Sequence, residues 1–233
     1  MSARLKALRR SKFYDLCAAA PLIAWYLFCA AQLLQPLEQQ IALAKVFVQT
    51  DWSVLPAGLV LGIVSRVATL VFLAILVVMF ALRRVPQATA PGFWPRCAAV
   101  GGTFLGVGIL LLPPHELSPA LYIVALVLMI GGTGFALAAV LVLGRSISIL
   151  PQARRLVTSG PYALVRHPVY LGEIVAMAGV ALQYLSPWAL LLLGLQYAFQ
   201  FARMKYEERL LSQAFADYAD YMARTARLLP GMY

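Results

Sequence analysis

Long runs of apolar residues, separated by short polar segments, dominate this chain. A helix that crosses a bilayer needs about 20 mainly apolar residues. Runs of this kind are Asp15–Leu34, Leu59–Leu82, Cys97–Leu112, Ser118–Gly144 and Val169–Phe201. The pattern predicts an all-α protein built as a polytopic bundle of membrane helices.

Two N-terminal segments need separate interpretation. The run Asp15–Leu34 follows a basic start and exceeds the 7–15 apolar residues typical of a cleaved signal, so we expect an uncleaved signal anchor. Between Gln35 and Pro56, apolar residues recur at helical spacing, with glutamines and Lys45 among them. This segment is compatible with an interfacial amphipathic helix on the outer side or with an ordinary connecting helix packed on the bundle.

Composition supports the membrane class. The 233 residues are 62% hydrophobic and 12% charged, whereas about 25% of residues are charged in ordinary soluble domains. The net charge of +10 is also unevenly distributed, because the connections Gln35–Ser53 and Pro113–Leu117 contain no basic residue except Lys45. The basic residues gather instead at the N-terminus and in three later clusters: Arg83, Arg84 and Arg96; Arg145, Arg154, Arg155 and Arg166; and Arg203, Lys205, Arg209, Arg224 and Arg227.

This asymmetry follows the positive-inside rule rather than the pattern of a nucleic-acid-binding face. It predicts a cytoplasmic location for the N-terminus, the basic clusters and the C-terminus. The basic N-terminus and small size suggest a bacterial inner-membrane protein. Both ends of the run Val169–Phe201 then lie on the cytoplasmic side, and Tyr184–Pro187 supplies a break near its middle. We therefore expect four spans plus a helical hairpin, five to six passes in all.

The segment Gly160–Glu173 (GPYALVRHPVYLGE) concentrates polar chemistry at the start of this hairpin. His167 precedes a proline, which suits the first helical position, so a helix should begin near Val169. Free amides at that start, together with Arg166, would favour an anionic group. For each residue alone, the alternative is a membrane-interface anchor.

The interface-anchor interpretation explains Glu173 less well, because an acidic group inside an apolar helix usually has a functional or paired role. Tyr170 shares its helix face. Gly172 would allow a second backbone or a flat ligand to approach closely. Arg66 poses a similar question in the second span, where it either snorkels to the outer interface or pairs inside the bundle, for example with Glu173.

A second polar cluster follows the hairpin, where Arg203–Leu211 (RMKYEERLL) opens a predicted C-terminal helix with one apolar stripe. Alone, this would be an ion-paired surface helix. The hairpin, however, returns the chain to the membrane face that carries Arg166 and His167, so the two clusters should meet.

The paired motifs G-P-Y-x-x-V-R-H-P-x-Y-x-G-E and R-x-x-x-E-E-x-x-L-x-x-x-F-x-x-Y-x-x-Y, separated by a hydrophobic hairpin, resemble the isoprenylcysteine carboxyl methyltransferase family and the related phospholipid N-methyltransferases. The resemblance covers roughly residues 143–230. It implies N-terminal transmembrane helices over 1–142 and a cofactor-binding region over 143–233, within one structural domain overall. The family commonly has glycine at the position of Ala216. This departure bears on where the C-terminal helix ends rather than on the chemistry.

The resemblance implies S-adenosylmethionine as the cofactor. It also implies that Arg203 and Glu207 act in catalysis, with Arg203 orienting the substrate. Together with Glu173, the expected cofactor-binding residues are Tyr162, Arg166, His167, Tyr170, Gly172, Glu207 and Glu208. The acceptor would be a lipophilic or small molecule that carries a carboxylate, thiol or amine, and membrane lipids are the expected partners.

Other functions remain compatible with the sequence. One is a sterol-reductase-like oxidoreductase that uses NADPH, and another is a non-enzymatic membrane scaffold or carrier. Two histidines and three dispersed cysteines (Cys17, Cys29 and Cys97) do not predict a metal site. Nucleic acid is not an expected partner.

Overall fold

The computed structural model describes residues 11–231, and helices make up almost all of their regular structure. The predicted all-α class and polytopic bundle are confirmed. The α-helices are α2 (Lys12–Thr50), α3 (Ala57–Leu82), α4 (Trp94–Phe104), α5 (Pro119–Leu143), α6 (Pro161–Leu164), α7 (Pro168–Gln183), α8 (Pro187–Ala214) and α9 (Tyr218–Arg224). Short 3₁₀ helices are η1 (Trp52–Val54), η2 (Leu105–Leu111) and η3 (Gly144–Ser146), and β1 (Ala88–Thr89) pairs antiparallel with β2 (Gln152–Ala153).

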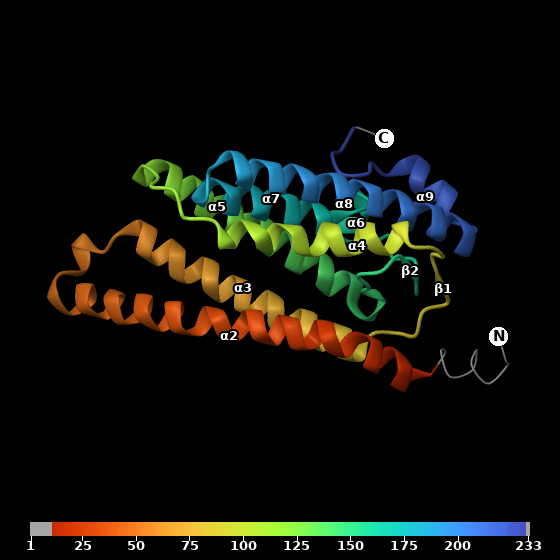
Figure 1. Cartoon of the computed structure of the whole chain (residues 1–233), viewed down its shortest axis with the longest axis horizontal. Coiled ribbons are helices and arrows are strands. Elements are labelled where there is room, and N and C mark those ends of the chain that lie inside the picture. The colour runs from red at the N-terminus through yellow and green to blue at the C-terminus, as the bar shows by residue number, and fades with distance from the viewer. Residues whose placement is uncertain (1–10, 232–233) are drawn as a thin grey trace.

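The long helices run side by side along the longest dimension of the molecule (Figure 1). Within residues 11–231, four helical stretches are long and apolar enough to cross a membrane: α2, α3, α4 continued by η2, and α5 continued by η3. Each contains one of the first four predicted apolar runs apart from a residue or two at its ends. The four expected spans are therefore confirmed.

The segment Gln35–Pro56 does not form a helix of its own. Helix α2 continues without interruption to Thr50, and both Pro21 and Pro36 lie inside it. The expectation of a separate interfacial or connecting helix was therefore wrong. The physical reason is tertiary packing, because α2 lies along α3 over much of its length. Its 39 residues correspond to about 58 Å, well beyond the roughly 30 Å hydrocarbon core.

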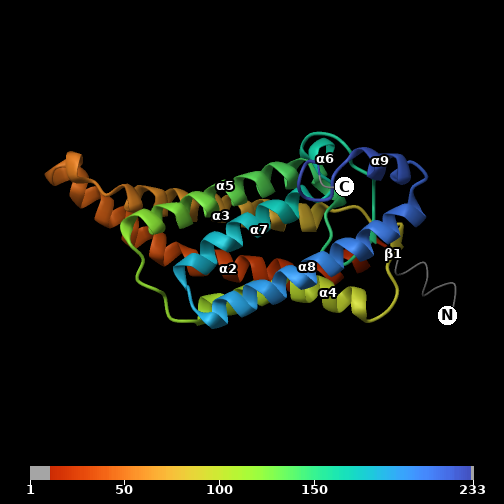
Figure 2. The same ribbon diagram turned by 90° about the horizontal axis from the view of Figure 1, so that it is seen from above.

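Helices α7 and α8 form the predicted hairpin, and the break lies at the predicted place (Figure 2). The Ser186 hydroxyl caps α8 by accepting from the Ala189 amide, and Pro187 occupies the first helical turn. At the tip, the His115 amide donates to the Gln183 carbonyl at 2.8 Å. The hairpin therefore reaches the connection between η2 and α5, although the 16 residues of α7 extend only about 24 Å.

The predicted C-terminal helix opening at Arg203 is instead the continuation of α8, which runs from Pro187 to Ala214. A short break separates it from α9, so the expected apolar stripe is divided between two helices. The chain leaves the helical conformation at Phe215, beside Ala216, where the sequence departs from the family pattern.

Glycines bring α5 and α7 into close contact. A Cβ added at Gly172 would lie 2.6 Å from the Gly132 carbonyl oxygen and 2.6 Å from the Ala136 amide nitrogen. Small residues at such contacts let helix backbones approach, which is how membrane helices gain packing energy. This packing fixes α7, and with it the polar cluster at the start of the helix.

Arg66 and Glu173 do not pair with each other. A Cβ added at Gly62 would lie 2.9 Å from Gln40 Nε2 and 3.6 Å from Arg66 Nη1, which places the arginine at the α2–α3 contact. Glu173 instead accepts a hydrogen bond from Gln200 Nε2 at 2.8 Å, across the hairpin.

Residues from two of the later basic clusters meet at one end of the bundle. Asp15 lies 2.8 Å from Arg83 Nε and 3.1 Å from Arg154 Nη2, and the Arg84 amide donates to the Arg145 carbonyl. Helices α6 and α9 lie at the same end (Figure 2). Residues 4–10 of the N-terminal cluster lie outside the described part of the chain. A cytoplasmic location for this end remains a prediction from the charge asymmetry.

Candidate functional site

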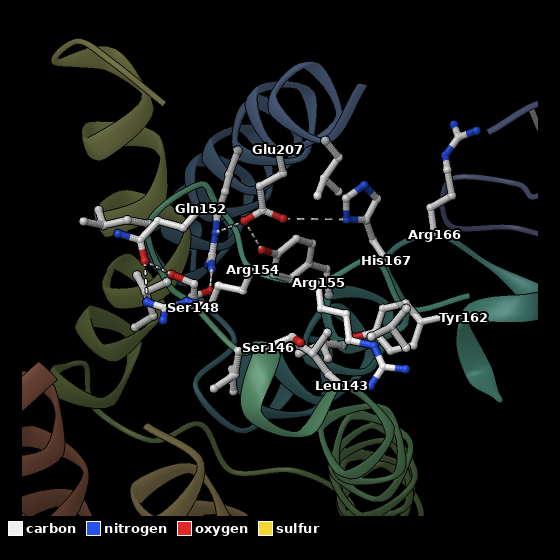
Figure 3. Close-up of a pocket in the computed structure, with 18 of the residues that line it drawn as sticks. Leu143, Ser146, Ser148, Gln152, Arg154, Arg155, Tyr162, Arg166, His167 and Glu207 are labelled. Atoms are coloured by element: carbon white, nitrogen blue, oxygen red, sulfur yellow. Dashed lines mark hydrogen bonds and ion pairs between the residues drawn. The ribbon is translucent and has the colours of Figure 1, made fainter. Parts of the chain in front are cut away.

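A cavity opens at this end of the bundle, between the hairpin and the loop that follows α5 (Figure 3). It encloses about 1100 Å³ of space free of protein atoms, part of which is open to solvent. Its polar wall comes mainly from α6, the start of α7 and the end of α8. Its apolar wall comes from α2, α3, α5 and the loop after α5, and includes Tyr26, Leu76, Phe80, Leu143 and Ile147.

The entry to α7 is held by backbone hydrogen bonds to the C-terminal segment. Val165 bridges with Ala226, the Arg166 amide donates to the Ala226 carbonyl at 2.8 Å, and the His167 amide donates to the Arg227 carbonyl at 3.2 Å. His167 has φ −125° and ψ 59°, which lies outside the helical region that a following proline disfavours. Helix α7 therefore starts at Pro168, one residue from the predicted start, with His167 as its N-cap.

Glu208 is the centre of a buried ion cluster beside this entry. It accepts from Arg166 Nε at 3.1 Å and from Arg227 at 3.0 and 2.5 Å, and it lies 3.2 Å from His167 Nε2. Burial by itself would raise the pKa of Glu208. Hydrogen bonds with His167 and Arg227 and the charge of Arg166 outweigh burial and lower this pKa to about 2.

Glu207, the preceding residue, points into the cavity (Figure 3). Its Oε1 atom accepts from the Tyr170 hydroxyl at 2.6 Å and from Arg203 Nε at 3.1 Å. Its Oε2 atom lies 4.0 Å from His167 Nδ1 and has no hydrogen-bond partner among residues 11–231. One oxygen is thus fixed by the protein, while the other remains available as an acceptor.

Arg203 connects the hairpin to the rest of the bundle. Besides Glu207, its guanidinium donates to Thr103 Oγ1 and to the Ser148 carbonyl, both at 3.1 Å. It also lies over the Tyr170 ring, 4.7 Å from the centroid, and the His167 ring stacks on Tyr170 at 5.4 Å between centroids. These contacts leave Glu207 and Tyr170 little freedom to move.

Seven of the predicted site residues line the cavity, although they come from both sides of the hairpin: Tyr162, Arg166, His167, Tyr170, Glu173, Arg203 and Glu207. The other two predicted residues do not line it. Gly172 is packed against α5, so the close approach it permits is that of a backbone. Glu208 lies behind the wall, because Arg166, His167 and Arg227 surround its carboxylate.

Sequence reasoning missed several residues that line the cavity. Tyr26 belongs to α2 and Tyr218 to the short α9, and both had been assigned to apolar helix faces or spans. Arg154 and Arg155 had been counted only as positive-inside charges. One feature of the sequence could have indicated that these arginines belong to the site. They lie shortly before Gly160, in a loop that also carries the polar residues Ser148 and Gln152.

The chain is similar to two curated proteins. Over 122 residues, the chain is 33% identical to the cobalt-zinc-cadmium resistance protein CzcN of Cupriavidus metallidurans; the match covers 52% of this chain and 56% of CzcN. Over 124 residues, it is 32% identical to the nickel-cobalt-cadmium resistance protein NccN of Alcaligenes xylosoxydans xylosoxydans, covering 52% and 58%. The match therefore spans a little over half the length of these relatives.

The names of both relatives concern metal resistance. Among residues 11–231, no group of three or more His, Cys, Asp or Glu side chains is arranged to hold a metal ion.

A match to the phospholipid methyltransferase family covers residues 120–218. This segment begins with α5, contains the whole hairpin and ends at Tyr218. It therefore includes both polar clusters that meet at the cavity. The segment 120–218, which carries the motifs that line the cavity, thus matches the phospholipid methyltransferase family, a family of membrane methyltransferases.

Proposed function

We propose that this protein transfers a methyl group from S-adenosylmethionine to a lipophilic or small acceptor that carries a carboxylate, thiol or amine. The proposal rests on the hydrogen bonding of the Glu207 carboxylate. Tyr170 and Arg203 hold one of its oxygens, and the other faces the cavity without a hydrogen-bond partner in the described residues. Such an oxygen accepts hydrogen bonds from ribose hydroxyls or an amino group.

The other groups around the cavity also fit this cofactor. The face of Tyr162 would attract a sulfonium through cation–π contact, worth about 0.5–2 kcal/mol. The Tyr218 hydroxyl is buried and has no partner within residues 11–231, so it offers a donor to a bound ligand. Arg203 would keep Glu207 oriented, and the expectation that it also orients the acceptor stays part of the proposal.

When bound, the cofactor would supply a methyl group already activated by its sulfonium. The protein then needs to contribute mainly binding and orientation, which can lower a barrier by about 7–11 kcal/mol. The apolar wall at Leu76, Phe80 and Leu143 suits the hydrocarbon part of an acceptor that enters from the membrane. On the expected topology, the polar mouth of the cavity faces the cytoplasm, where the cofactor is dissolved.

Isothermal titration of the detergent-purified chain tests the cofactor. We expect S-adenosylmethionine and S-adenosylhomocysteine to bind and NADPH not to bind. Binding of NADPH alone would favour the oxidoreductase, and binding of none of the three would favour a scaffold or carrier. Incubation of a lipid extract with methyl-labelled cofactor, followed by mass spectrometry, would then identify the acceptor.

A further inference from the structure

Arg154 has an unusual environment for a buried cation. Its side chain is fully buried, and it lines the cavity directly after β2. Only one of its three nitrogens is used: Nη2 donates to Asp15 Oδ1 at 3.1 Å and to Gln152 Oε1 at 2.6 Å. The Nε and Nη1 atoms are buried and have no partner in residues 11–231. Buried donors of a charged group are costly to leave unpaired.

The charges around Arg154 do not balance. Asp15 also faces Arg83 Nε at 2.8 Å and Lys12 Nζ at 4.0 Å, so one carboxylate serves three cations. Arg155 is exposed, lines the same cavity and forms no ion pair among residues 11–231. Residues 1–10 contain no Asp or Glu side chain that could supply the missing negative charge.

We infer that Arg154 and Arg155 form a subsite for an anionic oxygen group, a phosphate or a carboxylate, in the wall formed by the loop after α5. Guanidinium groups bind such oxygens through short, charge-assisted hydrogen bonds. An incoming anion would satisfy the unpaired donors of Arg154 and offset the excess positive charge. Arg155, at the solvent side, would attract the anion first.

The subsite differs in chemistry from the wall around Glu207, which accepts hydrogen bonds and does not favour an anion. This inference rests on the proposed function in one respect: it assigns the anionic group to the methyl acceptor, which would then be a phosphate- or carboxylate-bearing molecule. The cofactor has a carboxylate of its own, so the experiment must distinguish these two sources.

The test is titration of the purified full-length chain, in nonionic detergent, with inorganic phosphate. Arg154→Lys keeps a charge beside Asp15 but removes the guanidinium donors, and Arg155→Gln changes an exposed residue. We expect Arg154→Lys to weaken phosphate binding by about tenfold and Arg155→Gln to weaken it by a smaller factor. The matched control is Arg209→Gln, an equal charge change on an exposed α8 residue outside the cavity; it should bind like the parent.

A parent chain that does not bind phosphate would overturn the subsite, as would Arg154→Lys and Arg155→Gln variants that bind it as tightly as the parent. If Arg154→Lys does not fold, the phosphate affinity of Arg155→Gln decides whether the subsite exists. A second titration in the presence of S-adenosylhomocysteine identifies the source of the anion. Simultaneous binding supports the acceptor, whereas competition assigns the subsite to the carboxylate of the cofactor and overturns the acceptor assignment. Absence of S-adenosylhomocysteine binding refutes the proposed function, while the phosphate titration still decides the subsite.

Discussion

The Tyr170 hydroxyl donates a hydrogen bond to Glu207 Oε1 at 2.6 Å, which joins the first turn of α7 to the last part of α8. Thirty-seven residues separate the two side chains in the sequence. The hairpin between them brings them together, and Arg203 Nε donates to the same oxygen at 3.1 Å. The candidate site therefore depends on the hairpin returning to the membrane face from which it started.

Removing the Glu207 carboxylate should impair binding of S-adenosylmethionine without unfolding the protein. Glu207→Gln weakens an acceptor that faces the cavity, and Tyr170→Phe removes the donor that orients it. We expect each substitution to weaken binding about tenfold, since hydrogen bonds to charged groups contribute about 1.5–3 kcal/mol. The measurement is calorimetric titration. Tyr206→Phe, a neighbouring change outside the cavity, serves as the control; equal affinities across all of these variants would refute the site.

Glu208 should make the stability of the protein depend on acidic pH. Its pKa is about 2 in the folded chain, below the ordinary 4.5. Its stabilising contribution is therefore present above about pH 4.5 and is lost as the pH falls toward 2. In Glu208→Gln this contribution is missing at every pH. The difference in melting temperature between parent and variant should shrink from pH 6 to pH 3; a difference that stays constant would contradict the ion cluster.

Gly172 should matter for packing rather than for binding. In Gly172→Ala, the new methyl group would lie 2.6 Å from backbone atoms of Gly132 and Ala136, so α5 and α7 would have to separate. Overpacking of this kind costs about 1–3 kcal/mol of stability.

The control for this prediction is Gly131→Ala, on the same helix pair but with open space around the added methyl group. It should leave the melting temperature unchanged or raise it slightly, because alanine favours helix. Thermal unfolding in detergent, followed by tryptophan fluorescence, compares the two variants. A Gly172→Ala protein as stable as Gly131→Ala would show that the close helix contact is absent.

The hairpin also predicts which exposed positions share a membrane face. Cysteines introduced at Ser159 and Ala223 should react with a membrane-impermeant reagent from the same side. A cysteine at Glu116, near the hairpin tip, should react from the other side. The experiment requires a background without the three native cysteines. On the positive-inside rule, the first two positions are cytoplasmic; labelling of Ser159 and Ala223 from opposite sides would exclude the hairpin.

Much of this protein follows from the sequence alone. Uninterrupted apolar runs determine the four spans, because a backbone in lipid must satisfy its hydrogen bonds internally and therefore forms helices. The Ser186–Pro187 break and the His167–Pro168 helix start are equally local, since proline restricts its own backbone and that of the preceding residue. The motifs on either side of the hairpin indicated that Arg166, His167, Tyr170 and Glu207 would meet.

Tertiary packing decided the remainder. Nothing local distinguishes Gln35–Thr50 from a separate surface helix; contact with α3 makes it part of α2. Likewise, only the ion pairs of Arg166 and Arg227 show that Glu208 stabilises the structure while its neighbour Glu207 faces the cavity. Arg154 reads in the sequence as one more topogenic charge. In the fold it is buried beside Asp15, 139 residues away in the chain, and becomes a candidate anion-binding residue of the cavity. The physical reason is that an unpaired donor costs free energy only where water is excluded.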